Sequence, residues 1–504
     1  MPDHALDRGP AHAVVVGGGI SGLAAAHALL ESGAPGARSV RVTVLEASGR
    51  VGGKLAGDEV GGAMVDVGAE SVLARRPEAV ELIRAAGLGE DLTYPVTTSA
   101  GLWIGDRIRP LPPTVMGVPV DLAAAAGVLG ADGTTRAGQD RELPPPALDG
   151  DVAIGRFVAE RMGRAVTDRL VDPLLGGVYA GRADEISLAA AVPELFARLH
   201  DAPSLIAAAE QLRAAGQQAA DQRSGADDAG RDGSSSRDPA GSAVPPVFAG
   251  VRGGVHRMAP ALRDELERRG VEVRTGCTVR GITRDGGGFV LETGPVPAPE
   301  RITADAVVVA APARPAARML DGLAPAASAE LGAIEYASLA IVTLAVRRTD
   351  WPVTTGSGFL VPAVEGRVIK ASTYSHAKWD WTAEAGGELA IFRTSVGRLG
   401  EEQVLQRDDA DLVAASAADL REAIGLDAEI VDGTVTRWGG ALPQYAVGHL
   451  DRVDRIERAV AAVPGLAVCG AAYRGVGIAA CVASGRQAAT RVREHLDRLA
   501  RMAP

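Results

Sequence analysis

The first pattern along the chain is a short, uniformly apolar run followed by helical spacing of apolar residues. Residues 13–16 read Ala-Val-Val-Val, which indicates a buried strand, and residues 20–31 repeat apolar positions with the period of a helix. A second apolar strand, residues 40–45, ends at Glu46. Together these segments predict a βαβ unit, the building block of a parallel sheet, at the start of the chain.

Comparable segments recur in the middle and at the end of the chain. Further helices are predicted at residues 77–88, 255–269, 408–424 and 479–499. Further strands are predicted at residues 271–274, 278–283, 288–292, 305–310 and 466–470, and within 334–349 and 358–374. Because the buried parallel-type strands lie at the start, middle and end, we expect a discontinuous nucleotide-binding domain into which a second domain is inserted.

The intervening region from about residue 94 to 250 has a different character. Helical patterns occupy residues 151–175 and 187–213, whereas residues 131–150 are polar, rich in proline and predicted as a loop. Residues 214–243 contain no Val, Ile, Leu, Met or aromatic residue. Such a segment buries too little apolar surface to offset its ordering entropy, so disorder is predicted there.

Composition excludes several classes of protein. The chain has 504 residues, enough for about two to four domains, and its net charge of −11 disfavours nucleic-acid binding. Three scattered cysteines predict neither a disulfide framework nor a metal site, and they fit a reducing cytoplasm. No signal-peptide pattern or long apolar run is present. Only three of the 52 basic residues are lysines, so an anionic ligand would meet mostly arginine forks.

The strongest local motif is the glycine-rich sequence from Gly17 to Gly22, which follows a strand and opens a helix. In this G-x-G-x-x-G pattern Gly17 permits a tight turn, Gly19 lets the backbone approach a pyrophosphate, and Gly22 allows close packing of helix on strand. Glu46, at the end of the next strand, suits ribose hydroxyls and would repel a 2′-phosphate. The motif predicts a dinucleotide but leaves FAD and NAD both open.

A second glycine-rich turn follows the last predicted strand. Residues 469–478 read Cys-Gly-Ala-Ala-Tyr-Arg-Gly-Val-Gly-Ile and precede the closing helix. A turn of this kind can direct backbone N–H groups at the edge of a flavin ring and stabilise negative charge on it. A purely structural turn is the alternative.

Longer stretches resemble the bacterial porphyrinogen oxidases of haem synthesis, within the flavin amine-oxidase superfamily. These stretches are EASGRVGGK (46–54), DVGAESVLARRPE (66–78), RLVDPLLGGVYAG (169–181), GSGFLVP (356–362), RWGGALPQYAVGHL (437–450) and the turn at 469–478. Residues 172–181, 442–450 and 470–478 are the more specific ones, and they are similar to the Gram-positive enzymes that act on coproporphyrinogen III. The resemblance covers nearly the whole chain.

The resemblance implies an α/β (α+β) fold in which a three-layer ββα, Rossmann-like FAD domain is split in three. The FAD domain would comprise residues 1–93, 247–315 and 437–504. The inserted parts would be a helical, substrate-side domain at 94–213, a disordered linker at 214–246 and a mixed-sheet substrate domain at 316–436. The cofactor-binding residues implied are Gly17, Gly18, Gly19, Ile20, Ser21, Gly22, Glu46, Ala47, Arg50, Gly53, Lys54, Val67, Gly68, Ala69, Glu70, Val279, Trp438, Val476, Gly477 and Ile478.

The resemblance also implies the reaction: oxidation of a porphyrinogen by FAD and O2, in which six hydrogens are removed and three H2O2 are formed. Arg76 falls where the family has a basic residue facing a substrate propionate, although Arg75 is an alternative. Tyr179, Tyr445 and Tyr473 are candidates for the wall of the substrate cavity, with core packing as the alternative. No catalytic side chain is predicted, because the cofactor carries the redox chemistry.

Several alternatives stay open at this point. The substrate could be coproporphyrinogen III or protoporphyrinogen IX, and an amine oxidase or a carotenoid-type desaturase would share the fold. A flavin- or haem-binding chaperone is a further alternative, because fold alone does not establish activity. The resemblance leaves open a monomer or a homodimer, a peripheral membrane contact and a transient contact with the next enzyme of the pathway.

Overall fold

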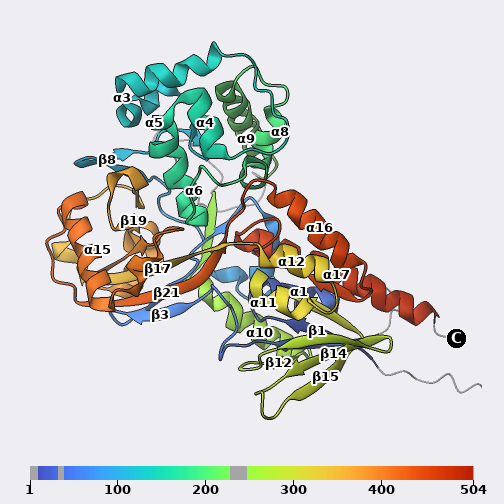
Figure 1. The fold of residues 1–504 in the computed structure, drawn as a ribbon. Coiled ribbons are helices and arrows are strands. Elements are labelled where there is room, and N and C mark those ends of the chain that lie inside the picture. Colours follow the sequence, from blue (N-terminus) through green and yellow to red (C-terminus); the bar gives the residue numbers. More distant parts are fainter. Residues whose placement is uncertain (1–9, 32–38, 228–246, 503–504) are drawn as a thin grey trace, which may run out of the picture.

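The computed structural model describes residues 10–31, 39–227 and 247–502, and a five-stranded parallel sheet lies at the centre of one half of it (Figure 1). The strand order is β12-β2-β1-β16-β22, and every neighbouring pair is parallel. The strands are β1 (Ala11–Val16), β2 (Val40–Leu45), β12 (Glu272–Arg274), β16 (Ala306–Val309) and β22 (Leu466–Val468). The sheet is therefore assembled from the start, middle and end of the chain, as predicted.

Both faces of this sheet are covered, which gives three layers. One face packs against α1 (Ile20–Glu31), α2 (Pro77–Ala85), α10 (Met258–Arg268) and α17 (Ile478–Met502). The opposite face packs against β13 (Gly281–Asp285), β14 (Gly288–Thr293), β15 (Glu300–Ala304), α11 (Ala313–Leu320), α12 (Pro325–Gly332) and α16 (His449–Ala461). This is the predicted ββα arrangement, and burial on both faces explains why the parallel strands are uniformly apolar.

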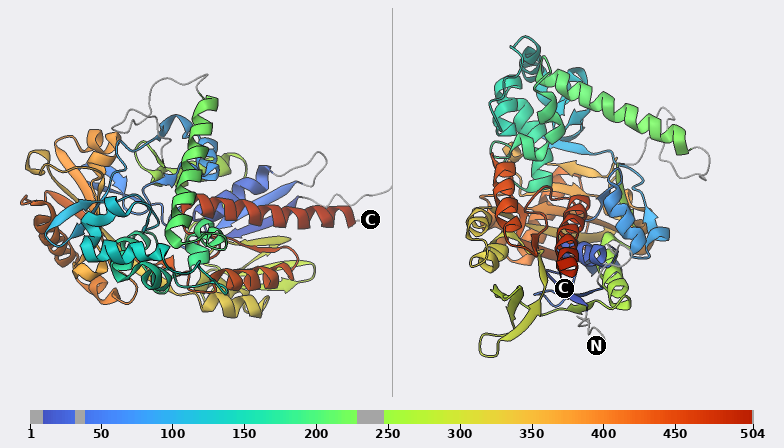
Figure 2. Two further views of the ribbon diagram at one scale, coloured as in Figure 1. Left: turned by 90° about the horizontal axis from the view of Figure 1, so that it is seen from above. Right: turned by 90° about the vertical axis from the view of Figure 1, so that its right-hand side faces the viewer.

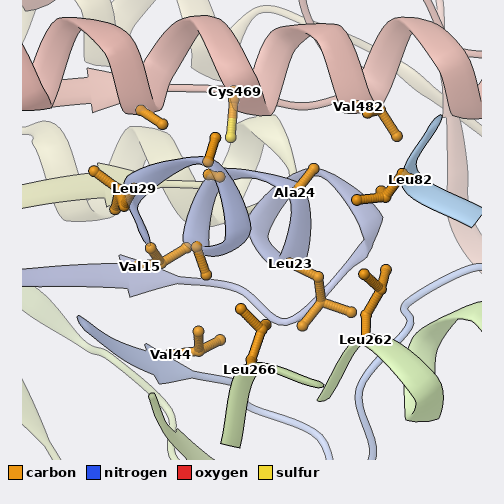
Figure 3. Packing of buried hydrophobic residues seen from close by; sticks show 14 of the residues in the cluster. Val15, Leu23, Ala24, Leu29, Val44, Leu82, Leu262, Leu266, Cys469 and Val482 are labelled. Carbon is orange, nitrogen blue, oxygen red and sulfur yellow. The ribbon is translucent and has the colours of Figure 1, made fainter. Parts of the chain in front are cut away.

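Helix α1 is enclosed by apolar side chains from segments that are far apart in the sequence (Figure 3). Val15, Leu23, Leu262 and Val482 gather around it, and all four are fully buried. The closest approach is between α1 and α17: a Cβ on Gly485 would lie 2.2 Å from the backbone oxygen of Ser21. The first βαβ unit is thus held in place by the last helix of the chain.

A second, seven-stranded sheet forms the other main part of the molecule. Its order is β21-β17-β20-β19-β18-β7-β8, and one face packs against α15 (Asp409–Ile424). The strands are β7 (Gly101–Ile104), β8 (Arg107–Pro110), β17 (Tyr336–Arg347), β18 (Gly358–Leu360), β19 (Ile369–Thr373), β20 (Leu389–Val396) and β21 (Asp432–Pro443). The predicted substrate domain therefore recruits residues 101–110 from the segment assigned to the helical domain, and β21 crosses the predicted boundary at residue 436.

The helical part lies beyond one edge of the seven-stranded sheet (Figure 1). Its helices are α3 (Leu122–Gly138), α4 (Ile154–Met162), α5 (Arg164–Val166), α6 (Asp172–Tyr179), α7 (Leu188–Ala191), α8 (Pro193–Arg198) and α9 (Leu205–Asp227). A π-helical turn at Thr167–Val171 joins α5 to α6. Helix α6 contacts β18 and β19, so the helical part and the sheet meet there.

Two predictions for this part are wrong. Helix α3 extends through residue 138, so residues 131–138 are helical rather than loop. Helix α9 continues through residue 227, so residues 214–227 are ordered (Figure 2); residues 228–246 lie outside the described part of the chain. Residues 214–227 are rich in alanine and glutamine, whose intrinsic helix propensity sustains a helix without an apolar face. Residues 131–138 follow a kink at Gly130 (φ +74°) and bury Ala137. No helix in the described ranges is long and apolar enough to cross a membrane.

The close contact between α1 and α17 predicts that Gly485→Ala destabilises the protein. The added methyl group would overlap the Ser21 backbone oxygen, and such overpacking costs about 1–3 kcal/mol. We expect a lower melting temperature and a lower free energy of unfolding. Gly216→Ala is the matched control, because Gly216 on α9 has open space around its Cβ position and the change should stabilise the helix by about 0.5–1 kcal/mol. Equal melting temperatures for the two variants would contradict the assigned contact.

Candidate cofactor and substrate site

The glycine-rich loop between β1 and α1 adopts the geometry that its motif requires. Gly17 has a φ of +112°, and a Cβ there would lie 2.6 Å from the backbone oxygen of Ala310. A Cβ on Gly22 would lie only 1.9 Å from the backbone oxygen of Gly17. Gly19, in contrast, has open space at its Cβ position, directly before the first turn of α1. The amino terminus of α1 therefore offers free N–H groups to an anionic ligand.

Glu46 ties this loop to two other segments. Its Oε2 accepts a hydrogen bond from Gly18 N (2.7 Å), and its Oε1 accepts from the backbone N and the hydroxyl of Ser48 (both 2.8 Å). The Glu46 backbone oxygen accepts from Cys277 N at 2.8 Å, which brings the segment leading to Val279 beside it. The half-buried carboxylate thus lies where the sequence places the ribose end of a dinucleotide.

The loop that follows β2 folds against the glycine-rich loop. Gly52 N donates to the backbone oxygen of Gly18 at 2.8 Å. Arg50 turns back on its own loop, where its guanidinium donates to the backbone oxygens of Gly53 (2.9 Å) and Leu55 (3.1 Å). Burial lowers the pKa of Lys54, whose ammonium makes no hydrogen bond or ion pair within the described part of the chain. Arg50 therefore shapes the loop, and Lys54 is the cation left for a ligand.

Residues 67–69 approach Lys54 and Trp438 closely. A Cβ on Gly68 would lie 2.2 Å from the Lys54 backbone oxygen and 3.0 Å from the indole ring of Trp438. The Trp438 indole N–H donates to the backbone oxygen of Val67 at 3.0 Å, and Ala69 N donates to the Lys54 backbone oxygen at 3.1 Å. Three predicted segments, far apart in the sequence, are thus brought into one site.

The Glu70 side chain belongs to a buried polar network and does not take part in the contacts of residues 67–69 with Lys54 and Trp438. Its carboxylate accepts hydrogen bonds from the Trp379 indole (2.7 Å), from Arg393 and from Lys378. Burial alone would raise the pKa of Glu70, but Arg393 and Lys378 hold it below the usual value. Only the backbone of Glu70 is left for a cofactor contact. Arg393 also donates to the Gly68 backbone oxygen at 2.9 Å, which links strand β20 to the turn.

The sequence analysis missed Arg393 and Lys378. A signal for Arg393 exists: it interrupts an otherwise apolar strand, LAIFRTSV, at a position whose neighbours are buried. A charged residue in a buried strand indicates a partner from elsewhere in the fold. The identity of that partner, Glu70, could not be read from the strand itself.

The closing turn at residues 471–478 is held by Tyr445. The phenol donates to the Ala471 backbone oxygen (2.7 Å) and accepts from Gly475 N (2.8 Å). Helix α17 begins at Ile478, and Cys481 in its first turn interacts with Ser21 and with Lys54. Val476, Gly477 and Ile478 therefore lie beside the amino terminus of α1 and the loop around Lys54, as the prediction requires.

The predicted substrate tyrosines are buried instead of facing an open cavity. Tyr473 is 2% exposed and packs in the core under the five-stranded sheet, and Tyr445 is 1% exposed. The Tyr445 ring stacks on His449 with centroids 3.8 Å apart, and burial lowers the His449 pKa to about 4. Tyr179 packs against Tyr445. The geometry thus corrects the prediction: Tyr445 and Tyr473 are packing and turn-holding residues.

Arg76 lies at the surface rather than with the residues above. Its side chain is 49% exposed and pairs with Glu78 at 3.1 Å, just before α2. No contact joins it to the glycine-rich loop or to Trp438 within the described ranges. Its proposed propionate contact stays a prediction.

The family model for flavin-containing amine oxidoreductases matches residues 20–493 of this chain. That match begins at the first residue of α1, directly after Gly19, and includes the second glycine-rich turn at residues 469–478. The chain belongs to this family. It is therefore an FAD-dependent oxidoreductase with the split cofactor domain that the sequence predicted.

The similarity to individual relatives also extends over nearly the full length. A Mycobacterium tuberculosis protein named coproporphyrinogen III oxidase is 36% identical over 490 residues, covering 96% of this chain and 97% of the relative. A Bacillus subtilis protein of the same name is 30% identical over 96% and 98% of the two chains. A solved structure from Exiguobacterium sp. 255-15 matches with a TM-score of 0.78 and 29% identity, covering 96% and 99%.

The residues of the site fit FAD. The space beside Gly19 admits a pyrophosphate at the amino terminus of α1, and Lys54 provides a cation without a protein partner. Glu46 is placed for the ribose, and the 475–478 turn directs the start of α17 toward the same region. These groups come from the first and the last segments of the split domain.

This arrangement predicts that Glu46→Gln weakens FAD binding. The change removes the charge from an acceptor that holds Gly18 N, and a hydrogen bond to a charged group corresponds to about tenfold or more in affinity. Titration of the apoprotein with FAD should show a higher Kd. Glu59→Gln, on the exposed hairpin strand β3 (Gly57–Val60), is the control that should leave the Kd unchanged. A wild-type Kd for Glu46→Gln would exclude the assigned role.

Proposed function

We propose that this protein oxidises coproporphyrinogen III to coproporphyrin III in haem synthesis, with FAD as cofactor and O2 as acceptor. The observation that carries the proposal is the similarity to relatives named coproporphyrinogen III oxidase over 96% of this chain. The geometry supports it, because the predicted cofactor segments converge and an uncovered sheet face lies beside them.

When bound, FAD accepts two electrons per cycle and passes them to O2, so that three cycles remove six hydrogens and yield three H2O2. The chain's own residues would hold the cofactor in position and stabilise negative charge on its ring. The amino terminus of α1 and Lys54 would hold the pyrophosphate, and Glu46 the ribose. The backbone N–H groups at the start of α17 would stabilise negative charge at the ring edge. Trp438, fixed by its bond to Val67, would limit how close the substrate comes to the ring.

The substrate would lie on the face of the seven-stranded sheet that α15 does not cover. Near Trp438 that face carries an apolar cluster formed by Ala337, Leu339, Ile341, Leu399, Ala441 and Leu442. An apolar surface beside the cofactor excludes water and suits the pyrrole rings of a tetrapyrrole. We assign no side chain as catalytic base, in keeping with the sequence prediction.

An anaerobic-to-aerobic turnover assay tests the proposed function. The purified flavoprotein is mixed with coproporphyrinogen III, and porphyrin fluorescence and H2O2 are followed after air is admitted. We expect porphyrin to form well above the rate of autoxidation, with about three H2O2 per porphyrin by the electron count. Protoporphyrinogen IX and a polyamine are run in parallel. Faster turnover of either alternative, with coproporphyrinogen III left at the autoxidation rate, would overturn the assignment.

Arg76→Ala tests the predicted propionate contact. If Arg76 holds a substrate carboxylate, its loss should raise KM about tenfold, the value of a charge-assisted hydrogen bond, and change kcat much less. Arg75→Ala is the matched neighbour and should leave KM near the wild-type value. An unchanged KM for Arg76→Ala would reject the contact and would confine its role to the surface pair with Glu78.

A further inference from the structure

One face of the seven-stranded sheet, the face that α15 does not cover, is only half-buried along one row of its central strands. On the covered face, Ala340 and Val342 of β17 are fully buried under α15. On the opposite face, Ile341, Ser395 and Ala371 form one cross-strand row through β17, β20 and β19, and all three are only half-buried. Ala345 and Ile391, farther along the same face, are fully buried, so the half-buried row borders a solvent-accessible space beside the sheet.

Helix α6 borders this space from the helical part. Its residues Gly177 and Val178 are exposed, with Val178 at 39%, and Leu360 on β18 lies 3.7 Å from the Cβ position of Gly177. Directly after the same end of α6, the Ala180 backbone oxygen accepts a hydrogen bond from Leu399 N at 2.7 Å. Leu399 packs in the same apolar cluster as Trp438, which links this end of α6 to the cofactor side.

Two buried cations lie beside this face. Lys370 directly precedes Ala371, at an irregularity in the pairing of β19 with β20, and is 6% exposed. Arg398 follows β20 and is 7% exposed; it donates to the Val361 backbone oxygen at 3.0 Å and lies 3.5 Å from the half-exposed carboxylate of Glu401. Both residues bind Val361: Arg398 donates to its backbone oxygen, and Val361 N donates to the Lys370 backbone oxygen at 2.9 Å, so the two cationic residues are neighbours.

Two carboxylates lie near these cations, Glu401 and Asp172, but neither pairs with Lys370. The Lys370 ammonium makes no hydrogen bond or ion pair within the described ranges, and Arg398 pairs with Glu401 and not with Asp172. Burial raises the pKa of Asp172, although the charge of Arg398 acts to lower it. Burial and the charge of Arg398 together lower the pKa of Lys370 to about 7. A buried ammonium without a partner is costly, and it is retained where a ligand supplies the counter-charge.

We propose that Lys370 and Arg398 form a carboxylate-binding site for the substrate, at the margin of the uncovered sheet face beneath α6. The inference rests on the proposed function and extends it, because it gives a second carboxylate position remote from Arg76. Arg398 offers a planar fork and Lys370 a point charge, a combination that suits one carboxylate. Coproporphyrinogen III carries four propionates and protoporphyrinogen IX two, so the site favours the tetracarboxylate.

Steady-state kinetics of Lys370→Met holoenzyme with both porphyrinogens test this site. Methionine keeps the length and removes the charge. We expect KM for coproporphyrinogen III to rise about tenfold, kcat to change less than about twofold, and KM for protoporphyrinogen IX to stay within about twofold. Arg398→Met should act in the same direction, and Lys370→Arg should restore most of the selectivity. Equal shifts in KM for the two substrates, or none, would overturn the site.

Controls separate this inference from folding and from the proposed function. Flavin absorbance and melting temperature establish that each variant is folded and loaded, and Arg421→Met on the exposed surface of α15 is the matched arginine control. Titration with oxidised coproporphyrin III measures binding without turnover. A wild-type protein that binds it more tightly than Lys370→Met but oxidises neither porphyrinogen would sink the proposed function and leave the site standing. Turnover of coproporphyrinogen III, with the same coproporphyrin III Kd for the wild type and Lys370→Met, would support the proposed function and overturn the site.

Discussion

Backbone segments approach one another around the cofactor site more closely than any side chain permits. A Cβ would fall 1.9 Å from a backbone oxygen at Gly22, 2.2 Å at Gly68 and 2.2 Å at Gly485. These positions join β1 to α1, the 67–69 turn to the loop of Lys54, and α1 to α17. Gly485 packs the last part of the split domain onto the first, and Gly17, whose Cβ would lie 2.6 Å from the Ala310 backbone oxygen, packs the first part onto the middle one. The three parts therefore approach most closely at positions where only glycine fits.

The orientation of the sheet toward the cofactor depends on a buried polar network and not on apolar packing alone. Arg393 on β20 binds both the Gly68 backbone oxygen and Glu70, and Trp438 on β21 donates to Val67. Breaking a buried ion pair by removing one partner costs about 3–5 kcal/mol, because the remaining charge is left without compensation. The network therefore sets the distance between the uncovered sheet face and the turn at residues 67–70 within narrow limits.

Local sequence patterns predicted the exact bounds of some elements but not how others pair within the sheets. The bounds of α1 and β2 agree with the prediction because caps, glycines and apolar spacing are all local signals. The membership of residues 101–110 in the seven-stranded sheet depends on pairing with β18, more than 240 residues away, which leaves no local trace. The residues of the cofactor site could be named because they belong to motifs; the structure brings their segments together, and their role in binding FAD stays a prediction.

Substrate residues were harder to predict than cofactor residues for a physical reason. Aromatic residues near a motif are as useful for packing as for binding, and Tyr445 and Tyr473 turned out to be buried around the closing turn. A lysine in an arginine-rich chain is a better signal, since all three lysines lie in or beside the site: Lys54 at the cofactor loop, Lys378 on Glu70 and Lys370 beside the sheet face. Under the proposed function, the redox chemistry depends on turns at the two ends of the chain, and we propose that substrate selectivity depends on charges carried by the domain inserted between them.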